Sequence, residues 1–280
     1  MKRNYIVVFS FALLFLAACS ENSSSVDSSD EISSSLSSSP SKQKKSSSSS
    51  KKSSSSVKSS SSVKSLSNEP VKKVDDGCIF DSLSNTVKDL RDGQVYKTVN
   101  IGGQVWMAEN LNYKTVESFC FNNIDNNCSK FGRLYTWATA IDSAGVFGEN
   151  GMGCGFNQKC SPIYPVRGIC FKGWHIPDAQ EWNKLVAVVG DPIGSKLKSV
   201  IGWNDRSGNG MDLFGFSVLP SGFRDFVGAF YGDSTRALFW SATEHDWYKA
   251  LSVEVQGYGG SDAKLSCEKD FAISIRCVKD

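Results

Sequence analysis

The chain has 280 residues, 40% of them hydrophobic, with 31 basic and 29 acidic side chains. This length accommodates one large domain or two small ones, and the near balance of charge gives no electrostatic basis for binding nucleic acid. Only two histidines are present, His175 and His245, which provides little material for a histidine-built metal or catalytic centre.

Residues 1–18 have the features of an export signal. Lys2 and Arg3 precede an apolar run that is too short for a good transmembrane helix. The run ends in LAAC, which resembles the lipobox of bacterial lipoproteins, where cleavage before the cysteine leaves it acylated with fatty acids such as palmitate. The alternative is ordinary cleavage near Ala18. We favour lipidation of Cys19, because removing it leaves eight cysteines, an even number suited to an oxidising compartment.

Residues 19–74 are predicted to carry the lipid and then to form a disordered tether. Between Ser20 and Ser67 the chain has 28 serines among 48 residues and few apolar side chains. Such a segment lacks the apolar surface that would offset the entropy lost on ordering. It is either a solvated spacer, which we favour, or a basic brush that contacts anionic lipid or wall polymer. Either way, we expect it to hold a domain away from a membrane.

Residues 75–280 are globular in composition and are predicted to form one domain. Alternating apolar residues predict strands at 94–101 and 104–108, joined by a Gly102-Gly103 turn. Asp178 followed by Glu181 predicts a capping box, and the helix that it starts ends at Gly190. The remaining expected elements are a helix at 134–142 and strands at 214–219, 238–242, 250–255 and 271–278. This mixture predicts an α+β class.

Eight cysteines in this domain predict a disulfide-stapled fold. Cys120 with Cys128, and Cys154 with Cys160, are close enough in sequence for small loop-closing bonds. Four cysteines remain for long-range bonds: Cys78, Cys170, Cys267 and Cys277. Cys170–Cys277 is the preferred pair, because both residues adjoin strongly patterned segments. Other connectivities stay open, and a metal site is the alternative, although no C-x2-C pair occurs.

Several strings in this domain together resemble one family. They are DGQVYKTV (92–99), IGGQVWMAENLNY (101–113), GRLYTW (132–137), GWHIP (173–177), EW (181–182), GFS (215–217), FWSATE (239–244) and IRCVKD (275–280). Their order resembles the Fibrobacter succinogenes major paralogous domain over nearly all of 89–280. The resemblance implies an exported protein with a lipoprotein signal, but no settled biochemical activity.

The late strand and the helix with its Glu-Trp pair are also similar to C-type-lectin-like folds, which relatives of the formylglycine-generating enzyme share. The resemblance therefore implies a C-type-lectin-like, disulfide-stapled single domain. It is an analogy of fold, which does not transfer function. The cysteines of formylglycine-generating enzymes have no recognisable counterpart in this sequence.

The loop at 205–212 has the oxygen pattern of a calcium loop. Asp205, Asn209 and Asp212 supply oxygen ligands around a turning glycine. A closing bidentate glutamate is missing, since Phe216 occupies that position, and turn-forming residues adopt the same pattern with no ion. Calcium is therefore an alternative at this loop, and we expect no other cofactor.

Catalytic groups are sparse. His175 lies between Trp174 and Ile176, where a structural histidine is favoured over a catalytic one. His245 is flanked by Glu244 and Asp246, an acid–base cluster in principle, but no motif places a serine or cysteine nucleophile. We therefore expect a protein that is not an enzyme.

Aromatic residues give the more useful indication. Five tryptophans sit in patterned apolar segments and are expected in the core: Trp106, Trp137, Trp174, Trp182 and Trp240. The candidate ligand-binding residues lie in loops rich in glycine, aspartate and serine: Trp203, Arg224, Tyr231, Trp247 and Tyr248. Such rings either stack on sugars or plug their own loops.

These features together predict a lipoprotein anchored in the cell envelope, at the outer membrane and exposed on the surface. Its domain is expected to bind a glycan or a cell-surface partner in adhesion, and not nucleic acid. The alternatives are a structural envelope protein without a soluble ligand, or an enzyme acting on polysaccharide or protein thiols.

Overall fold

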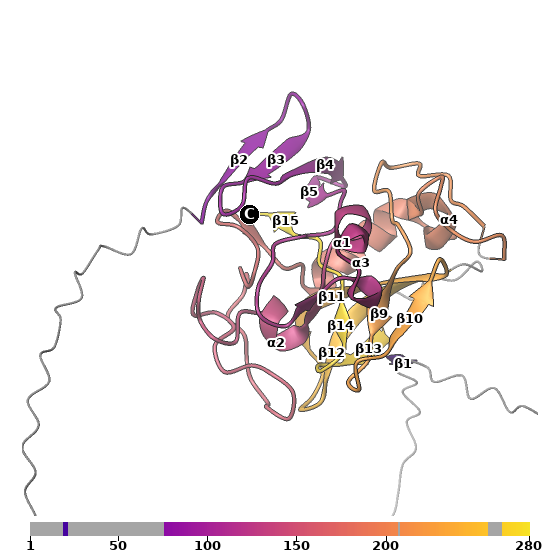
Figure 1. The fold of residues 1–280 in the computed structure, drawn as a ribbon. Coiled ribbons are helices and arrows are strands. Elements are labelled where there is room, and N and C mark those ends of the chain that lie inside the picture. Colours follow the sequence, from indigo (N-terminus) through magenta and orange to yellow (C-terminus); the bar gives the residue numbers. More distant parts are fainter. Residues whose placement is uncertain (1–18, 22–75, 207, 257–264) are drawn as a thin grey trace, which may run out of the picture. The chain divides into compact units, whose positions relative to one another are not determined.

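The computed structural model describes residues 19–21, 76–206, 208–256 and 265–280. The predicted signal peptide and nearly all of the predicted tether lie outside the described residues. From position 76 onward, the described residues belong to one compact unit, an α+β domain. Figure 1 shows its strands in two groups, one made of β2–β5 with β15 and the other of β9–β14.

The first sheet grows from the predicted hairpin. Its six described strands, in spatial order, are β2 (Cys78–Asp81), β3 (Thr86–Asp89), β4 (Val95–Ile101), β5 (Gln104–Met107), β15 (Val278–Lys279) and β8 (Trp174–His175). The β4–β5 hairpin confirms the expected strands at 94–101 and 104–108. Gly102 and Gly103 both have positive φ, the conformation that this two-residue turn requires.

The second sheet contains the C-terminal half of the domain. Its described strands, in spatial order, are β1 (Cys19–Glu21), β13 (Leu265–Glu268), β12 (Lys249–Gln256), β11 (Arg236–Glu244), β9 (Ser221–Arg224), β14 (Ala272–Ile273), β7 (Leu134–Thr136) and β6 (Ser118–Phe119), with β10 (Phe230–Asp233) paired to β9. Strands β11 and β12 confirm the strands expected at 238–242 and 250–255. The register of β1 places the backbone of Cys19 opposite Cys267.

Short helices connect these strands. They are η1 (Phe121–Asn123), α1 (Asp125–Phe131), α2 (Trp137–Ala140), α3 (Ala179–Val189) and α4 (Ile193–Leu197). Helix α3 has the predicted capping box, with Asp178 and Glu181 each accepting a backbone N–H of the other, and it ends at Gly190. Within the described segments, no helix has the length and apolar content needed to span a membrane.

Three expected elements are wrong in part or in full. The predicted helix at 134–142 begins as strand β7, because Tyr135 pairs with Ile273, and helix α2 starts only after the Thr136 cap. The predicted strand at 214–219 is a turn, in which the Asp212 carboxylate accepts the Ser217 N–H and hydroxyl and both residues adopt positive φ.

The predicted strand at 271–278 is also divided. Its first part is β14, in the large sheet, and its last part is β15, in the small sheet. The backbone between them carries the buried residues Ile275, Arg276 and Cys277. This segment therefore joins the two sheets instead of extending one of them.

The core lies between helix α3 and both sheets. Trp182 on α3 packs 4.7 Å from Trp106 of β5 and 5.8 Å from Phe239 of β11, measured between ring centroids. All five tryptophans expected in the core are buried. Each such side chain removes a large apolar area from water, so these contacts are a main source of stability.

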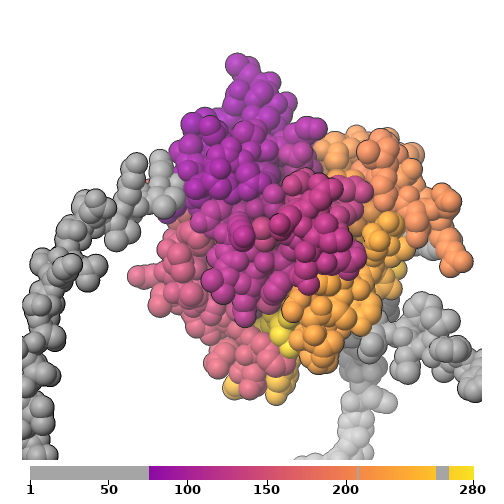
Figure 2. Space-filling model, in the orientation of Figure 1, coloured from indigo at the N-terminus to yellow at the C-terminus, as the bar shows by residue number. Residues whose placement is uncertain are grey.

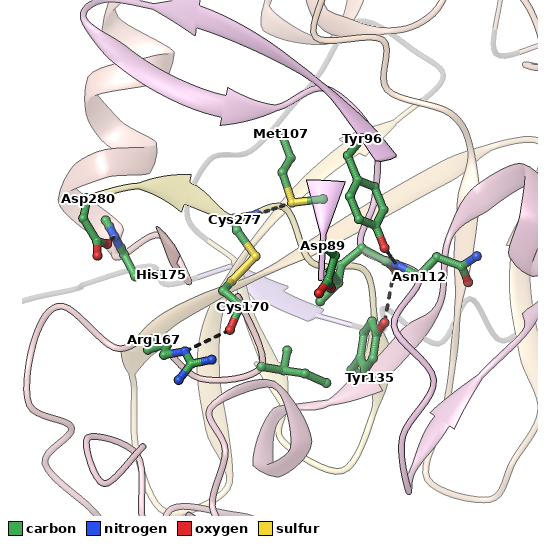
Figure 3. Close-up of a disulfide and its surroundings, with 12 residues drawn as sticks. Asp89, Tyr96, Met107, Asn112, Tyr135, Arg167, Cys170, His175, Cys277 and Asp280 are labelled. Carbon is green, nitrogen blue, oxygen red and sulfur yellow. Dashed lines mark hydrogen bonds and ion pairs between the residues drawn. A yellow bond between two sulfur atoms is a disulfide. The ribbon is translucent and has the colours of Figure 1, made fainter. Parts of the chain in front are cut away.

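Among the residues that the structure describes, three disulfides staple this core. Cys120–Cys128, Cys154–Cys160 and Cys170–Cys277 are the pairs that the sequence favoured. Cys170–Cys277 closes a separation of 107 residues, with Arg167 donating to the Cys170 carbonyl and the Cys277 N–H directed at the Met107 sulfur (Figure 3). The expectation of a disulfide at Cys78 is wrong: its half-buried thiol is free and donates to the Lys172 carbonyl.

A buried ion pair fixes the turn between β13 and β14. The Lys269 ammonium lies 2.5 Å from the Glu244 carboxylate, with side chains 0% and 10% exposed. Lys269 also donates to the Gln158 carbonyl and lies 4.7 Å from the Trp137 ring centroid. Glu244 accepts the Cys160 N–H as well. The pair thus ties strand β11 and the Cys154–Cys160 loop to one turn.

His175 bridges two elements. Its Nδ1 lies 2.6 Å from Asp280 and its Nε2 lies 2.9 Å from Glu181 of helix α3. Burial lowers the pKa of His175, but the hydrogen bonds with these carboxylates outweigh burial and raise it above 6.5. For Glu181, burial acts in the opposite direction and raises the pKa. The hydrogen bond with His175 lowers it, and the net result is a pKa below 4.5. This supports the structural interpretation of His175 (Figure 3).

We predict that Lys269→Met destabilises the fold strongly, because it leaves the Glu244 carboxylate buried without its counter-charge. The free energy of unfolding, measured by chemical denaturation of the oxidised protein, should fall by about 3–5 kcal/mol. Lys88→Met, at an exposed position of β3, is the matched control and should change it by less than about 0.5 kcal/mol. A loss below about 1 kcal/mol for Lys269→Met would contradict this role.

His175→Asn should lower stability in a pH-dependent way. A raised histidine pKa contributes stability below about pH 6.5 that is lost as pH rises through the folded-state value. The lowered Glu181 pKa contributes above about pH 4.5 and is lost at more acidic pH. The difference in melting temperature between wild type and variant should therefore be largest between these values and shrink at pH 8. A difference that grows towards pH 8 would exclude this linkage.

Candidate functional site

The turn between β13 and β14, residues 269–271, brings together most of the predicted ligand-binding segments. The Lys269 N–H donates to the Tyr248 carbonyl, and the Lys269 ammonium approaches the Trp247 carbonyl. On its other side, Phe271 stacks on Phe223 of β9. The loop that carries Trp247 and Tyr248 and the β9–β10 hairpin therefore border the same turn.

Four aromatic rings form a continuous stack beside this turn, and we call it the aromatic stack. Its members, in spatial order, are Tyr231, Phe223, Phe271 and Phe226. Neighbouring ring centroids lie 5.4, 6.0 and 6.3 Å apart, with interplanar angles of 24°, 6° and 29°. The two middle rings are buried, whereas Tyr231 is 41% and Phe226 is 63% exposed.

Local structure explains this arrangement. Tyr231 and Phe223 are direct cross-strand partners in the β9–β10 hairpin, so their side chains leave the sheet on the same face. Phe226 lies in the hairpin turn, where Asp225 accepts the Ala229 N–H and fixes the loop. Large apolar side chains in a solvent-exposed turn, Phe226 and Val227, are the signal that sequence reasoning missed.

Carboxylates surround the stack. Partial desolvation and then the charge of Asp225 raise the pKa of Tyr231, whose hydroxyl faces that carboxylate. Burial, followed by the charges of Glu268 and Asp225, raises the pKa of Asp270. The Asp270 Oδ1 atom is buried and accepts no hydrogen bond from the described residues. The site thus combines two exposed aromatic side chains with neighbouring carboxylates, and Asp225 and Asp270 were also missed from the sequence.

Trp247 and Tyr248 form the other border of the turn. Both side chains are 53% exposed, and Tyr248 meets the ring of Phe156 edge-on at 5.6 Å. Asp246 holds this loop by accepting the N–H groups of Tyr248 and Lys249. The structure therefore leaves these two predicted residues available at the surface.

Arg224 does not join this site. Successive residues of a strand face opposite sides of a sheet, so Arg224 points away from the face that Phe223 and Tyr231 share. Its guanidinium lies 4.1 Å from the Phe119 ring centroid. The prediction that Arg224 and Tyr231 form one binding surface is corrected by this alternation.

Trp203 is likewise unavailable as an exposed platform. It is only 6% exposed, its ring N–H donates to the Val218 carbonyl, and the Lys198 ammonium lies 4.8 Å from the ring centroid. It therefore plugs its own loop, the alternative role that its sequence context allowed.

The oxygens of the predicted calcium loop have protein partners. The Asn209 side-chain oxygen accepts the Trp203 N–H, and the Asp212 carboxylate accepts from Ser217. Asp205 is exposed. Within the described part of the chain, no three His, Cys, Asp or Glu side chains are grouped so as to hold a metal ion. Calcium at this loop stays a prediction.

The expected acid–base cluster is also divided. His245 pairs with Asp246, but Glu244 is engaged by Lys269. Exposed rings can stack on a ligand, and neighbouring carboxylates can accept hydrogen bonds from its hydroxyl groups, which is an arrangement for binding.

Comparison with known proteins gives one positive result. A search of curated proteins and a search of solved structures each returned no match. The family model of the Fibrobacter succinogenes major domain matches residues 99–279, which include strand β5, helix α3, the aromatic stack and the turn at 269–271. The chain therefore belongs to the Fibrobacter succinogenes major domain family.

Proposed function

We propose that this chain is a non-catalytic surface lipoprotein whose domain binds glycans through the aromatic stack. The observation that carries the proposal is the exposure of Tyr231 and Phe226 at the two ends of the stack, with the carboxylates of Asp225 and Asp270 in the neighbouring turns. Sugars present both an apolar ring face and hydroxyl donors, so a single ligand satisfies both features. Trp247 and Tyr248 extend the surface across the turn.

Rigidity supports this assignment. Phe223 and Phe271 are buried beneath the exposed rings, and the Lys269–Glu244 pair holds the turn that carries Phe271. A preformed site loses less conformational entropy when a ligand binds. The ion pair therefore contributes to binding through preorganisation.

The wider proposal concerns location and fold. Export, lipidation of Cys19 and anchoring at the outer membrane account for the apolar start, the LAAC string and the serine-rich segment. A C-type-lectin-like arrangement accounts for the resemblance of the GWHIP and FWSATE strings. An adhesive role on the cell surface, with polysaccharide or a surface protein as partner, follows from these together.

Two other functions differ in what they predict. A structural envelope protein would yield stable protein partners on pull-down but no glycan affinity. An enzyme acting on polysaccharide or protein thiols would show turnover that disappears in His175→Ala or Glu244→Ala. His175 is paired with Glu181, and Glu244 is paired with Lys269, so both side chains already have structural partners. This favours binding over catalysis.

Phe226→Ala should weaken retention on polysaccharide in affinity electrophoresis by at least about tenfold, the effect of losing ~1.4 kcal/mol of binding free energy. Because Phe226 is 63% exposed, the melting temperature should change little. Leu83→Ala, at a 94% exposed apolar residue between β2 and β3, is the matched control and should bind normally. Equal retention of both variants would remove the aromatic stack from the site.

Asp270→Asn provides the complementary test on the acceptor. Replacing a carboxylate that accepts a hydroxyl should also weaken binding about tenfold. Stability should not fall, because the raised Asp270 pKa means that the ionised side chain opposes folding, and removing that charge helps most at neutral pH and least below about pH 3.8. Unchanged affinity in this variant would exclude Asp270 as a ligand contact.

Cys19→Ser tests the anchor. Labelling with a radioactive fatty acid should be lost, and the protein should move from the membrane fraction to the soluble fraction, because acylation needs the cysteine thiol. A conservative control is Ser20→Ala, which should remain labelled. Retention of the same label by Cys19→Ser would refute lipidation at this position.

A further inference from the structure

A recess lies apart from the aromatic stack, among segments that are distant in sequence. Residues of strand β4, the residues that follow β5, helix α1 and the residues at 199–201 and 212–219 surround a volume of about 410 Å³. The violet, magenta and orange surfaces of these segments meet on the face shown in Figure 2. This volume lies within the range of roughly 300–1,000 Å³ that is typical of small-molecule sites.

Arg276 contributes the buried end of this recess. It is 1% exposed and sits against the rings of Phe216 and Phe239, at 4.4 and 5.3 Å from their centroids. Its guanidinium donates to the Asn110 side chain and to the carbonyls of Phe216 and Ser217. These bonds use three of the five N–H groups of an arginine, so donors remain at a fixed position.

Acceptors line the same recess. Glu109 and Asp212 lie near enough to raise the pKa of Arg276 by their charge, although burial is the larger effect and brings it down to about 9. The guanidinium is therefore still protonated at neutral pH. The Asn112 side-chain oxygen is buried and accepts no hydrogen bond from the described residues. Arg276, Glu109, Asp212 and Asn112 thus all line one recess.

The charge pattern restricts the ligand. An anion drawn to Arg276 would meet the carboxylates of Glu109 and Asp212, and a cation drawn to those carboxylates would meet the guanidinium. Lys97 and Lys130 also line the recess, but their side chains are exposed, so water screens their charge. A neutral molecule with several hydroxyl groups can donate to the acceptors and accept from Arg276 without a charge penalty.

We propose that this recess binds a small neutral polyol, either a free sugar or the end of a sugar chain, with Arg276, Asn112 and Glu109 as its hydrogen-bonding groups. The site is separate from the aromatic stack and does not depend on the function proposed for it. It would give the domain two kinds of carbohydrate contact, one along a ring face and one that encloses a sugar unit.

Saturation-transfer and protein-observed NMR titrations of the full-length protein, in a detergent without sugar groups, test this proposal. The probes are methyl β-glucoside as the neutral polyol, galacturonate as its anionic counterpart and glucosamine as its cationic counterpart. We expect the neutral glucoside to bind at least about tenfold more tightly than either charged sugar. Cellobiose and a soluble glucan then distinguish a free sugar from the end of a chain.

Ser129→Trp places a bulky ring in the recess from an exposed position of helix α1, and it should abolish glucoside binding. Asn126→Trp, also exposed on α1 but outside the recess, is the matched control and should bind normally. Asn112→Ala should weaken glucoside binding at the recess several-fold. Absence of glucoside binding, preference for a charged sugar, or normal binding by Ser129→Trp would each overturn the proposal.

Discussion

The buried Lys269–Glu244 ion pair is the interaction on which the proposed binding surface depends. Removing two charges from water is expensive unless each satisfies the other, so this pair can persist only while the turn and the Cys154–Cys160 loop are held together. Glu244 ends strand β11, and Lys269 leads directly into Phe271. One electrostatic contact thereby sets the position of Phe271, which stacks directly on Phe226 and supports Tyr231 through Phe223.

The segment 272–280 gives the domain its second constraint. It contributes β14 to the large sheet and β15 to the small sheet, and the Cys170–Cys277 disulfide lies between those strands and the loop that precedes β8. Arg276 and the His175–Asp280 contact lie in the same short stretch. The polar contacts of this stretch therefore connect the two sheets. They help to hold the recess and the aromatic stack in fixed positions within a small α+β domain.

The elements that could be predicted from the sequence are those fixed by residues close together along the chain. The Asp178–Glu181 capping box, the Gly102-Gly103 hairpin and the two short disulfide loops all act over a few positions. Sequence grouped Tyr231 with Arg224 and Trp203, because all three lie in loop-like contexts. Strand alternation and burial separate them, and the stack of Tyr231 on Phe223 and Phe271 requires pairing between distant segments. The burial that raises the pKa of Asp270 likewise depends on tertiary structure, so the sequence did not single out this residue.

The central claim is that the ends of the aromatic stack contact a glycan. Hydroxyl-radical footprinting of the full-length protein, with and without the neutral polysaccharide that retards it most in affinity electrophoresis, tests this directly. Oxidation of Phe226 and Tyr231 should fall when the polysaccharide is present, while oxidation of the exposed residues Leu83 and Ile163 is unchanged. If Phe226 and Tyr231 are oxidised as fast with the polysaccharide as without it, they do not contact the glycan and the proposed site is wrong.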